Sequence, residues 1–139
     1  MRANLDIQEF FQLATGERSG PIYVCNIERN LKEVIGSTTR AVWLSKYTLD
    51  KQLHRHPEMT PELYVDVSYI VQNGVCVLEK RNHLSFLLNA TATMGYWMKA
   101  CIKASCGGSE IYLVTFHKCR QRDVKRVLAK GMIVRSGNQ

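Results

Sequence analysis

The sequence predicts an α+β fold in which N-terminal helices are followed by a four-stranded antiparallel sheet and a basic C-terminal helix. Three observations lead to this prediction. In the first half of the chain, apolar residues recur at the spacing of a helix. After Gly74, apolar and polar residues alternate, as they do in strands. From residue 120 to residue 130 the helical spacing returns, now with many Lys and Arg side chains.

The N-terminal part contains short elements separated by clear breaks. Residues 5–14 carry apolar side chains on one helical face, and Gly16 follows them as a stop. Residues 22–27 and 41–45 have the composition of short strands, and residues 30–36 form a helical or turn segment. The predicted four-stranded sheet does not include these two strands.

The two central helices have recognisable ends. Leu49 and Leu53 lie one helical turn apart, and Pro57 ends their helix because the residue before a proline leaves helical geometry. Thr60-Pro61-Glu62 begins the next helix with a capping hydroxyl, a proline that needs no amide partner and an acidic first turn. That helix is expected to end at Asn73-Gly74.

The four strands of the predicted sheet cover residues 75–81, 83–89, 96–104 and 110–118. The turns between them are short, which favours an antiparallel meander. Strict alternation in the last strand places Leu113, Thr115 and His117 on one face and Tyr112, Val114 and Phe116 on the other.

The chain of 139 residues is long enough for one compact unit with its own core. Residues 36–39 (Gly-Ser-Thr-Thr) form the best internal boundary, which separates an N-terminal accessory helical segment (1–36) from a main domain (37–139). No apolar run approaches the roughly 18 residues of a membrane span. We therefore expect no membrane association and a cytoplasmic location.

The net charge of +7 lies entirely in the C-terminal part of the chain. Residues 1–98 contain ten basic and ten acidic side chains, whereas residues 99–139 contain nine basic and two acidic ones. A polyanion is the natural partner of such a surface, and nucleic acid is favoured over lipid because no amphipathic membrane helix accompanies the charge. The alternative is a basic surface that only keeps the protein soluble.

Cysteines and short motifs exclude several chemistries. The five cysteines are an odd number without a disulfide-like spacing, which favours reduced thiols in apolar strands. The spacing of Cys101, Cys106, His117 and Cys119 matches no structural zinc pattern, so no metal is expected. Signatures of nucleotide binding, serine hydrolases and metalloproteases are absent, and we expect no cofactor.

The triplet His54-Arg55-His56 lies at the end of a predicted helix and is the first candidate for chemistry. Metal-free RNA cleavage needs a base for the ribose 2′-hydroxyl, an acid for the leaving oxygen and cations for the phosphate. Histidine suits both proton transfers because its pKa lies near the operating pH. Residues two apart on a helix point in different directions, so one histidine is expected to line a site. The alternative is a solvated helix end whose positive charges suit the helix dipole.

The predicted sheet offers partners for such a histidine. Lys99 and Lys103 are four residues apart in one strand and therefore share a face. Together with Thr115 and His117 on the neighbouring strand, they would make a phosphate-binding surface. The alternatives are that Thr115 is an ordinary β-branched strand residue and that His117 is a strand-end residue near solvent.

The segment WLSKYTLDKQLHRHPEMTPELY (residues 43–64), followed by a sheet that ends in LVTFHK, resembles the phage-associated nuclease domains of the barnase–EndoU–colicin–RelE (BECR) fold superfamily. The similarity covers roughly residues 40–135. It implies a metal-independent endoribonuclease that acts through a 2′,3′-cyclic phosphate, a toxin or effector carried by phages or prophages. RNA and an inhibitor or immunity protein would be its partners, and delivery to a host cytoplasm by a phage particle would be its route.

The resemblance also implies a set of site residues. In such domains a histidine of the early helix, a basic strand residue and a late-strand Ser or Thr form the catalytic site. The matching catalytic candidates here are His54, His56, Arg81, Lys99 and Thr115. The candidates for binding the RNA are Arg55, Lys103, His117, Lys118, Arg120, Arg122, Lys125 and Arg126. A non-catalytic nucleic-acid-binding or virion-associated module is the alternative, since it explains the basic C-terminal part without using the histidines.

Overall fold

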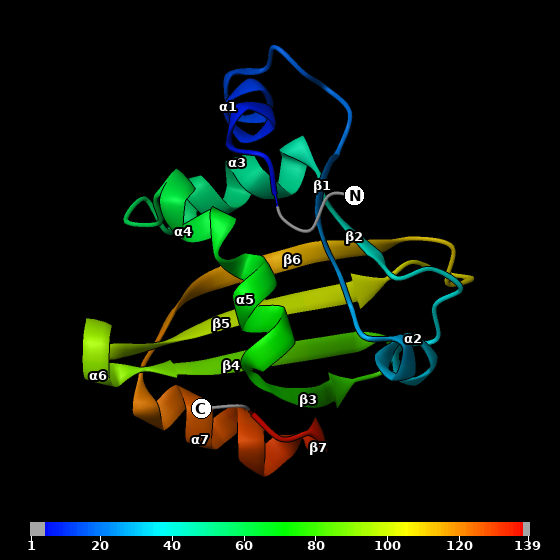
Figure 1. The fold of residues 1–139 in the computed structure, drawn as a ribbon, viewed down its shortest axis with the longest axis vertical. Helices are drawn as coiled ribbons and strands as arrows, with labels where there is room; N and C mark the ends of the chain where they lie inside the picture. The colour runs from blue at the N-terminus through cyan, green and yellow to red at the C-terminus, as the bar shows by residue number, and fades with distance from the viewer. Residues whose placement is uncertain (1–4, 138–139) are drawn as a thin grey trace.

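The structure is a computed structural model that describes residues 5–137. These residues form seven helices and seven strands (Figure 1). The helices are α1 (Ile7–Thr15), α2 (Arg29–Ile35), α3 (Lys46–Arg55), α4 (Pro61–Val65), α5 (Val67–Asn73), α6 (Thr91–Met94) and α7 (Gln121–Lys130). The strands are β1 (Ile22–Asn26), β2 (Ala41–Leu44), β3 (Val75–Lys80), β4 (His83–Ala90), β5 (Tyr96–Ala104), β6 (Ile111–Cys119) and β7 (Met132–Arg135).

All seven of these strands belong to one mixed sheet with the order β1-β2-β6-β5-β4-β3-β7. The prediction of a four-stranded antiparallel sheet is therefore wrong. Strands β3 to β6 pair in the order of the sequence. Strand β2 pairs with β6 in parallel, and β1 pairs with β2 in antiparallel orientation, so both belong to the same sheet. At the other edge β7 pairs with β3. The parallel pairing of β2 with β6 joins residues far apart in the sequence, which alternation within each strand does not reveal.

Residues 5–36 share the sheet and the core with the rest of the chain. Strand β1 forms one edge of the sheet, and Phe10 of α1 is buried against Tyr64 of α4 with 4.9 Å between ring centroids. Leu31 and Ile35 bury the inner side of α2 in the same apolar cluster.

One face of the sheet carries the main core. Phe86, Ala100, Ile102 and Phe116 point to this face from β4, β5 and β6 and are fully buried. Helix α5 crosses in front of these strands, as Figure 1 shows, and buries Val67, Ile70 and Val71 against the same cluster. Burial of this apolar surface drives the folding of this face.

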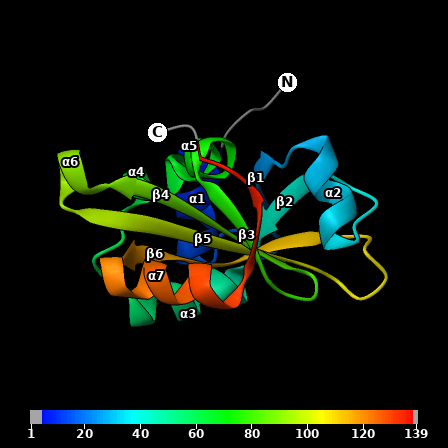
Figure 2. The same ribbon diagram turned by 90° about the horizontal axis from the view of Figure 1, so that it is seen from below.

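The opposite face is only partly covered. Helix α7 packs Val124, Val127 and Leu128 onto Val77 and Leu87 in a second, smaller cluster. Figure 2 shows α7 and α3 below the strands, and α5 and α2 above them. Beside α7 this face carries Ser85 of β4, Lys99 and Lys103 of β5, and Tyr112, Thr115 and His117 of β6. We call this whole side of the sheet the polar face.

A β-bulge decides which residues of β6 reach the polar face. Cys101 of β5 lies opposite Thr115, but Ile102 lies opposite Leu113, so Val114 is the extra residue. Leu113 is thereby turned into the core, and Tyr112 joins Thr115 and His117 on the polar face. Strict alternation predicted the reverse for Leu113 and Tyr112.

Helix α3 owes its start and end to local signals. The hydroxyl of Ser45 accepts a hydrogen bond from the amide of Thr48, which caps the first turn. The helix ends at Arg55, and His56 is the C-cap residue directly before Pro57.

The position of α3 along the sheet is fixed by one buried side chain, that of Gln52. Strand β2 pairs with β6 only at Ile111 and Tyr112, which leaves the rest of that edge of β6 without a strand neighbour. The amide of Gln52 fills part of this gap. Its Nε2 donates to the carbonyl of Val114 at 3.2 Å, and its Oε1 accepts from the amide of Phe116 at 3.3 Å. A side chain of α3 thus satisfies two backbone groups that a strand would otherwise pair.

We predict that Gln52→Ala destabilises the fold by roughly 2–3 kcal/mol, because it leaves two backbone groups of β6 unpaired in a desolvated position. Urea unfolding followed by circular dichroism measures this change. Lys51→Ala, an exposed neighbour on the same helix, is the control and should change stability by less than about 0.5 kcal/mol. Equal stability of the two variants would contradict the role given to Gln52.

A second set of hydrogen bonds joins the loop after α2 to the hairpin loop between β5 and β6. The carbonyl of Gly108 accepts hydrogen bonds from the amide of Thr38 at 2.8 Å and from the hydroxyl of Ser37 at 3.0 Å. Gly108 has φ +75°, and a Cβ there would overlap the carbonyl oxygen of Gly36. Only glycine fits this close backbone contact.

We predict that Gly108→Ala lowers the free energy of unfolding by about 3 kcal/mol, because backbone strain and a steric overlap act together. Gly107→Ala is the matched control. Gly107 also has positive φ (+88°), but its Cβ would meet open space, so strain alone should cost about 1 kcal/mol. Thermal unfolding of both variants would show the difference, and equal losses would argue against a tight contact at Gly36.

Candidate active site

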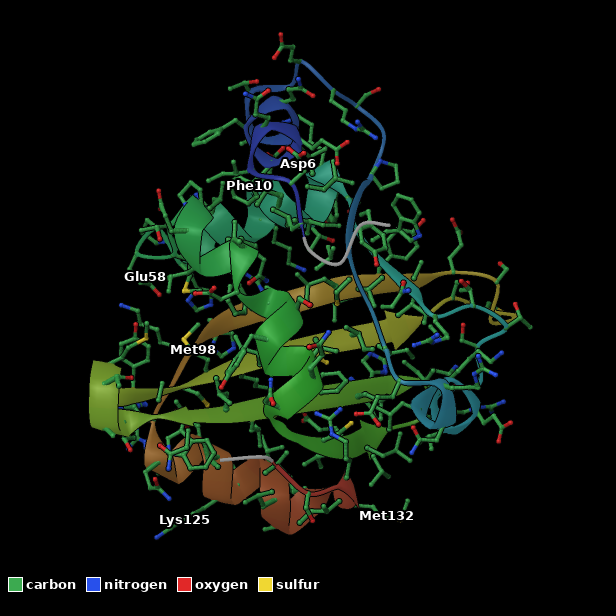
Figure 3. The ribbon with its side chains drawn as sticks, viewed as in Figure 1. Asp6, Phe10, Glu58, Met98, Lys125 and Met132 are labelled. Carbon is green, nitrogen blue, oxygen red and sulfur yellow. The ribbon has the colours of Figure 1, made fainter. Side chains whose placement is uncertain are left out.

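The polar face brings two histidines together. His56, at the end of α3, stacks on His117 of β6 with ring centroids 4.8 Å apart and an angle of 17° between the rings. The two residues are distant in sequence, and the Gln52 contact described above aligns the helix with the strand so that they meet. His56 also lies beside a carboxylate, with 3.4 Å between its Nδ1 and Oε2 of Glu58. Figure 3 labels Glu58 in the segment that joins α3 to α4.

The hydrogen bond of His117 defines its tautomer. Its Nδ1 lies 2.7 Å from the carbonyl oxygen of Lys118, which can only accept, so Nδ1 carries the proton in the neutral ring. The lone pair is then on Nε2. Burial lowers the pKa of His117 below its usual value, and the charges of His56 and Lys99 lower it further, against the opposing effects of the Lys118 carbonyl and Glu58. His117 is therefore a neutral imidazole near pH 7, suited to accept a proton.

Lys99 lies directly across from His117 in the neighbouring strand. Its ammonium nitrogen is 3.1 Å from Oε1 of Glu79, and its side chain is only 17% exposed. Ser85 donates a hydrogen bond to the same carboxylate. Burial raises the pKa of Glu79, but the hydrogen bonds of Ser85 and Lys99 and the nearby lysine charges outweigh it, so the pKa is lowered and the Glu79 carboxylate is ionised.

The next row of the sheet contains Ser85, Cys101 and Thr115 side by side. Burial raises the pKa of the Cys101 thiol, so this cysteine is not a thiolate nucleophile. Thr115 is half-buried one row away from His117. Its hydroxyl can therefore reach a ligand that also touches His117.

The basic helix α7 packs on the polar face beside these residues. Arg126 and Lys130 line a hollow of about 250 Å³ together with Lys99, Glu79 and Asp123. Asp123 is 3.4 Å from Arg120 and 3.8 Å from Arg126, so part of this charge is already paired. Two further basic residues, Arg122 and Lys125, are exposed on the same helix, and Figure 3 shows Lys125 extending away from the sheet.

Some predicted site residues lie elsewhere. His54 and Arg55 are exposed on the last turn of α3. Lys118 lies on the opposite face of β6 from His117, with its ammonium 4.6 Å from the ring centroid of Tyr96. Arg81 lies in the turn between β3 and β4, beyond the row that pairs His83 with Lys103. The structure thus groups His56, His117, Lys99 and Thr115, with Lys103 farther along the same face.

Three residues that matter for this geometry were not predicted. Glu58 and Glu79 provide carboxylate partners for His56 and Lys99, and Gln52 sets the helix against β6. Glu79 alternates with Val75 and Val77, which would have indicated its face. Gln52 lies three residues after Leu49, so helical spacing would have placed it on the buried side of its helix, although its partners in β6 could not be foreseen.

Comparison of the chain with protein-family models, curated proteins and solved structures gives no match. Among residues 5–137, no helix is both long and apolar enough to cross a membrane. The same residues contain no group of three or more His, Cys, Asp or Glu side chains placed to hold a metal ion.

We predict that His56→Ala raises the pKa of His117, because it removes both a covering ring and a neighbouring positive charge. An NMR titration of the His117 ring protons measures the shift. His54→Ala, which changes an exposed ring two residues away, should leave that pKa unchanged.

The same lowered pKa has a consequence for stability. The folded state holds His117 neutral. Its contribution to the free energy of unfolding is therefore fully present above pH 6.5, the approximate pKa of histidine in the unfolded chain, and is lost as the pH falls toward its lower pKa in the folded protein. The loss should be smaller in His117→Asn. An identical pH dependence of unfolding in both proteins would argue that His117 titrates as it does in water.

Proposed function

We propose that this protein is a metal-independent endoribonuclease. The observation that supports the proposal best is the stacked His56–His117 pair, beside Lys99, on the polar face of a basic protein. Two imidazoles with different partners supply both proton transfers that RNA cleavage needs, and the lysine supplies a positive charge.

The two histidines are suited to different steps. His117, neutral with its lone pair on Nε2, takes the proton of the ribose 2′-hydroxyl, and the oxygen attacks the adjacent phosphorus. His56, with the Glu58 carboxylate beside Nδ1, gives a proton to the leaving 5′-oxygen. The products are a 2′,3′-cyclic phosphate and a free 5′-hydroxyl. Lys99 and the hydroxyl of Thr115 stabilise the charge that develops on the phosphate oxygens.

Helix α7 would hold the RNA backbone next to this site. The exposed side chains of Arg122, Lys125 and Arg126 carry positive charge along one helix. Each phosphate contact releases counterions, so affinity should fall steeply as salt concentration rises.

A non-catalytic nucleic-acid-binding module is the second candidate, and one observation favours it. The ammonium of Lys99 is already paired with Glu79, and a phosphate would have to share or displace that partner. A binding module would retain the basic helix and would have no use for the histidine pair.

The proposal is tested by incubating the purified protein with a labelled single-stranded RNA in EDTA. We expect products that end in a cyclic phosphate from the wild type. His56→Ala and His117→Ala should each lower the rate by about 10²–10⁴, the usual contribution of a general acid or base.

His54→Ala is the matched control, since it removes an exposed histidine from the same helix end and should keep nearly full activity. Loss of activity in His54→Ala with retention in His56→Ala would contradict the assignment. Salt-sensitive RNA binding without cleavage by the wild type would favour the binding module.

A further inference from the structure

A row of aromatic side chains crosses the polar face at the end of the sheet away from the histidines. Tyr23 of β1 lies opposite Trp43 of β2, and Trp43 lies opposite Tyr112 of β6. The next residue in the row is Lys103 of β5. Residues directly opposite one another in a sheet share a face, so the three rings and the ammonium lie on the same surface.

This row and the histidine pair are on one continuous surface. Lys103 and Lys99 share a face of β5 because they are four residues apart, and Lys99 lies opposite His117. At the rise of a strand, four residues correspond to roughly 13 Å. A ligand extended along β5 and β6 would therefore reach both places.

The three rings are not part of the apolar interior. None of them belongs to either buried cluster, and each residue is half-buried, so none is fully removed from solvent. Tyr23 and Trp43 are in edge-to-face contact with 5.9 Å between ring centroids, so the indole packs against the tyrosine ring.

A hollow lies beside Tyr112, at the end of this row of rings next to Lys103. It has a volume of about 270 Å³ and is lined by Thr48 of α3, Lys103, Ala104, Ser105, Tyr112 and Val114. The hydroxyl of Tyr112 donates to Glu110 at 2.9 Å, which orients the ring. The Glu110 carboxylate repels phosphate from that edge, so a nucleotide here would place its base on the ring and its phosphate toward Lys103.

We infer that the row Tyr23–Trp43–Tyr112 is a stacking platform for the unpaired bases of single-stranded RNA. The inference extends the proposed function, since it gives the site its substrate class. Aromatic side chains on an open sheet surface stack bases without regard to sequence, and a neighbouring cation holds the backbone. A duplex keeps its base faces stacked on one another, so it cannot use such a platform. The net charge of +7 complements the polyanion that the rings would hold.

Binding is measured with a fluorescent single-stranded 2′-O-methyl RNA, which lacks the 2′-hydroxyl nucleophile and so is not cleaved by the proposed mechanism. A duplex of the same length is the second probe. Trp43→Leu and Tyr112→Leu should each weaken binding of the single strand about tenfold, the usual effect of removing one stacking ring. Binding of the duplex should change by less than twofold.

Three controls keep the result specific. Trp43→Phe and Tyr112→Phe retain a ring and should bind the single strand nearly as well as the wild type. Tyr47→Leu removes a highly exposed aromatic ring that lies outside the row, and it should have little effect. Circular dichroism of every variant checks that the fold is retained.

Two results would overturn the platform: single-strand binding that does not change in the leucine variants, or an equal loss for single strand and duplex. These binding results can be distinguished from the result of the cleavage experiment. A wild type that does not cleave RNA, with selective loss of single-strand binding in Trp43→Leu, would reject cleavage and support the platform. A wild type that cleaves RNA, with no effect of either leucine substitution on binding, would do the reverse.

Discussion

The geometry of the polar face depends on the two hydrogen bonds between Gln52 and the edge of β6. Strand β2 leaves that edge after two residue pairs, and the helix that follows it has to satisfy backbone groups that no strand reaches. With its amide anchored at Val114 and Phe116, α3 runs beside β6 in the same direction. Its last residues therefore arrive at His117, and its first turn arrives at Tyr112.

The two faces of the sheet have separate tasks. The core face and its helices contain the large buried apolar cluster. The polar face contains only the small apolar cluster under α7. Polar groups on this second face are paired among themselves, as in Ser85–Glu79–Lys99, so their partial burial is tolerated. Because stability comes mainly from one side, the other side can hold half-buried rings and charges next to one another.

Much of the local structure followed from local signals. Pro57, the Thr60-Pro61-Glu62 start and the alternation after Gly74 indicate elements whose cause lies within a few residues. The face shared by Lys99 and Lys103 follows from strand geometry alone. The partnership of His56 with His117 could not be predicted, because it requires the parallel pairing of β2 with β6 and the contacts of Gln52. Tyr112, and not Leu113, faces the polar side because of a β-bulge, and strict alternation cannot show such a bulge.

The place of β6 in the sheet also determines the order in which the protein can assemble. The hairpin β1–β2 and the strands β3, β4 and β5 can each pair among themselves, but β6 is the strand that joins these two groups. It is also the sixth in chain order among the seven strands of residues 5–137, so it is made after β1 to β5. Until β6 is made, no strand joins β2 to β5, and His56 lacks the His117 ring on which it stacks. The histidine pair therefore forms only after β6 has been made, because His117 belongs to that strand.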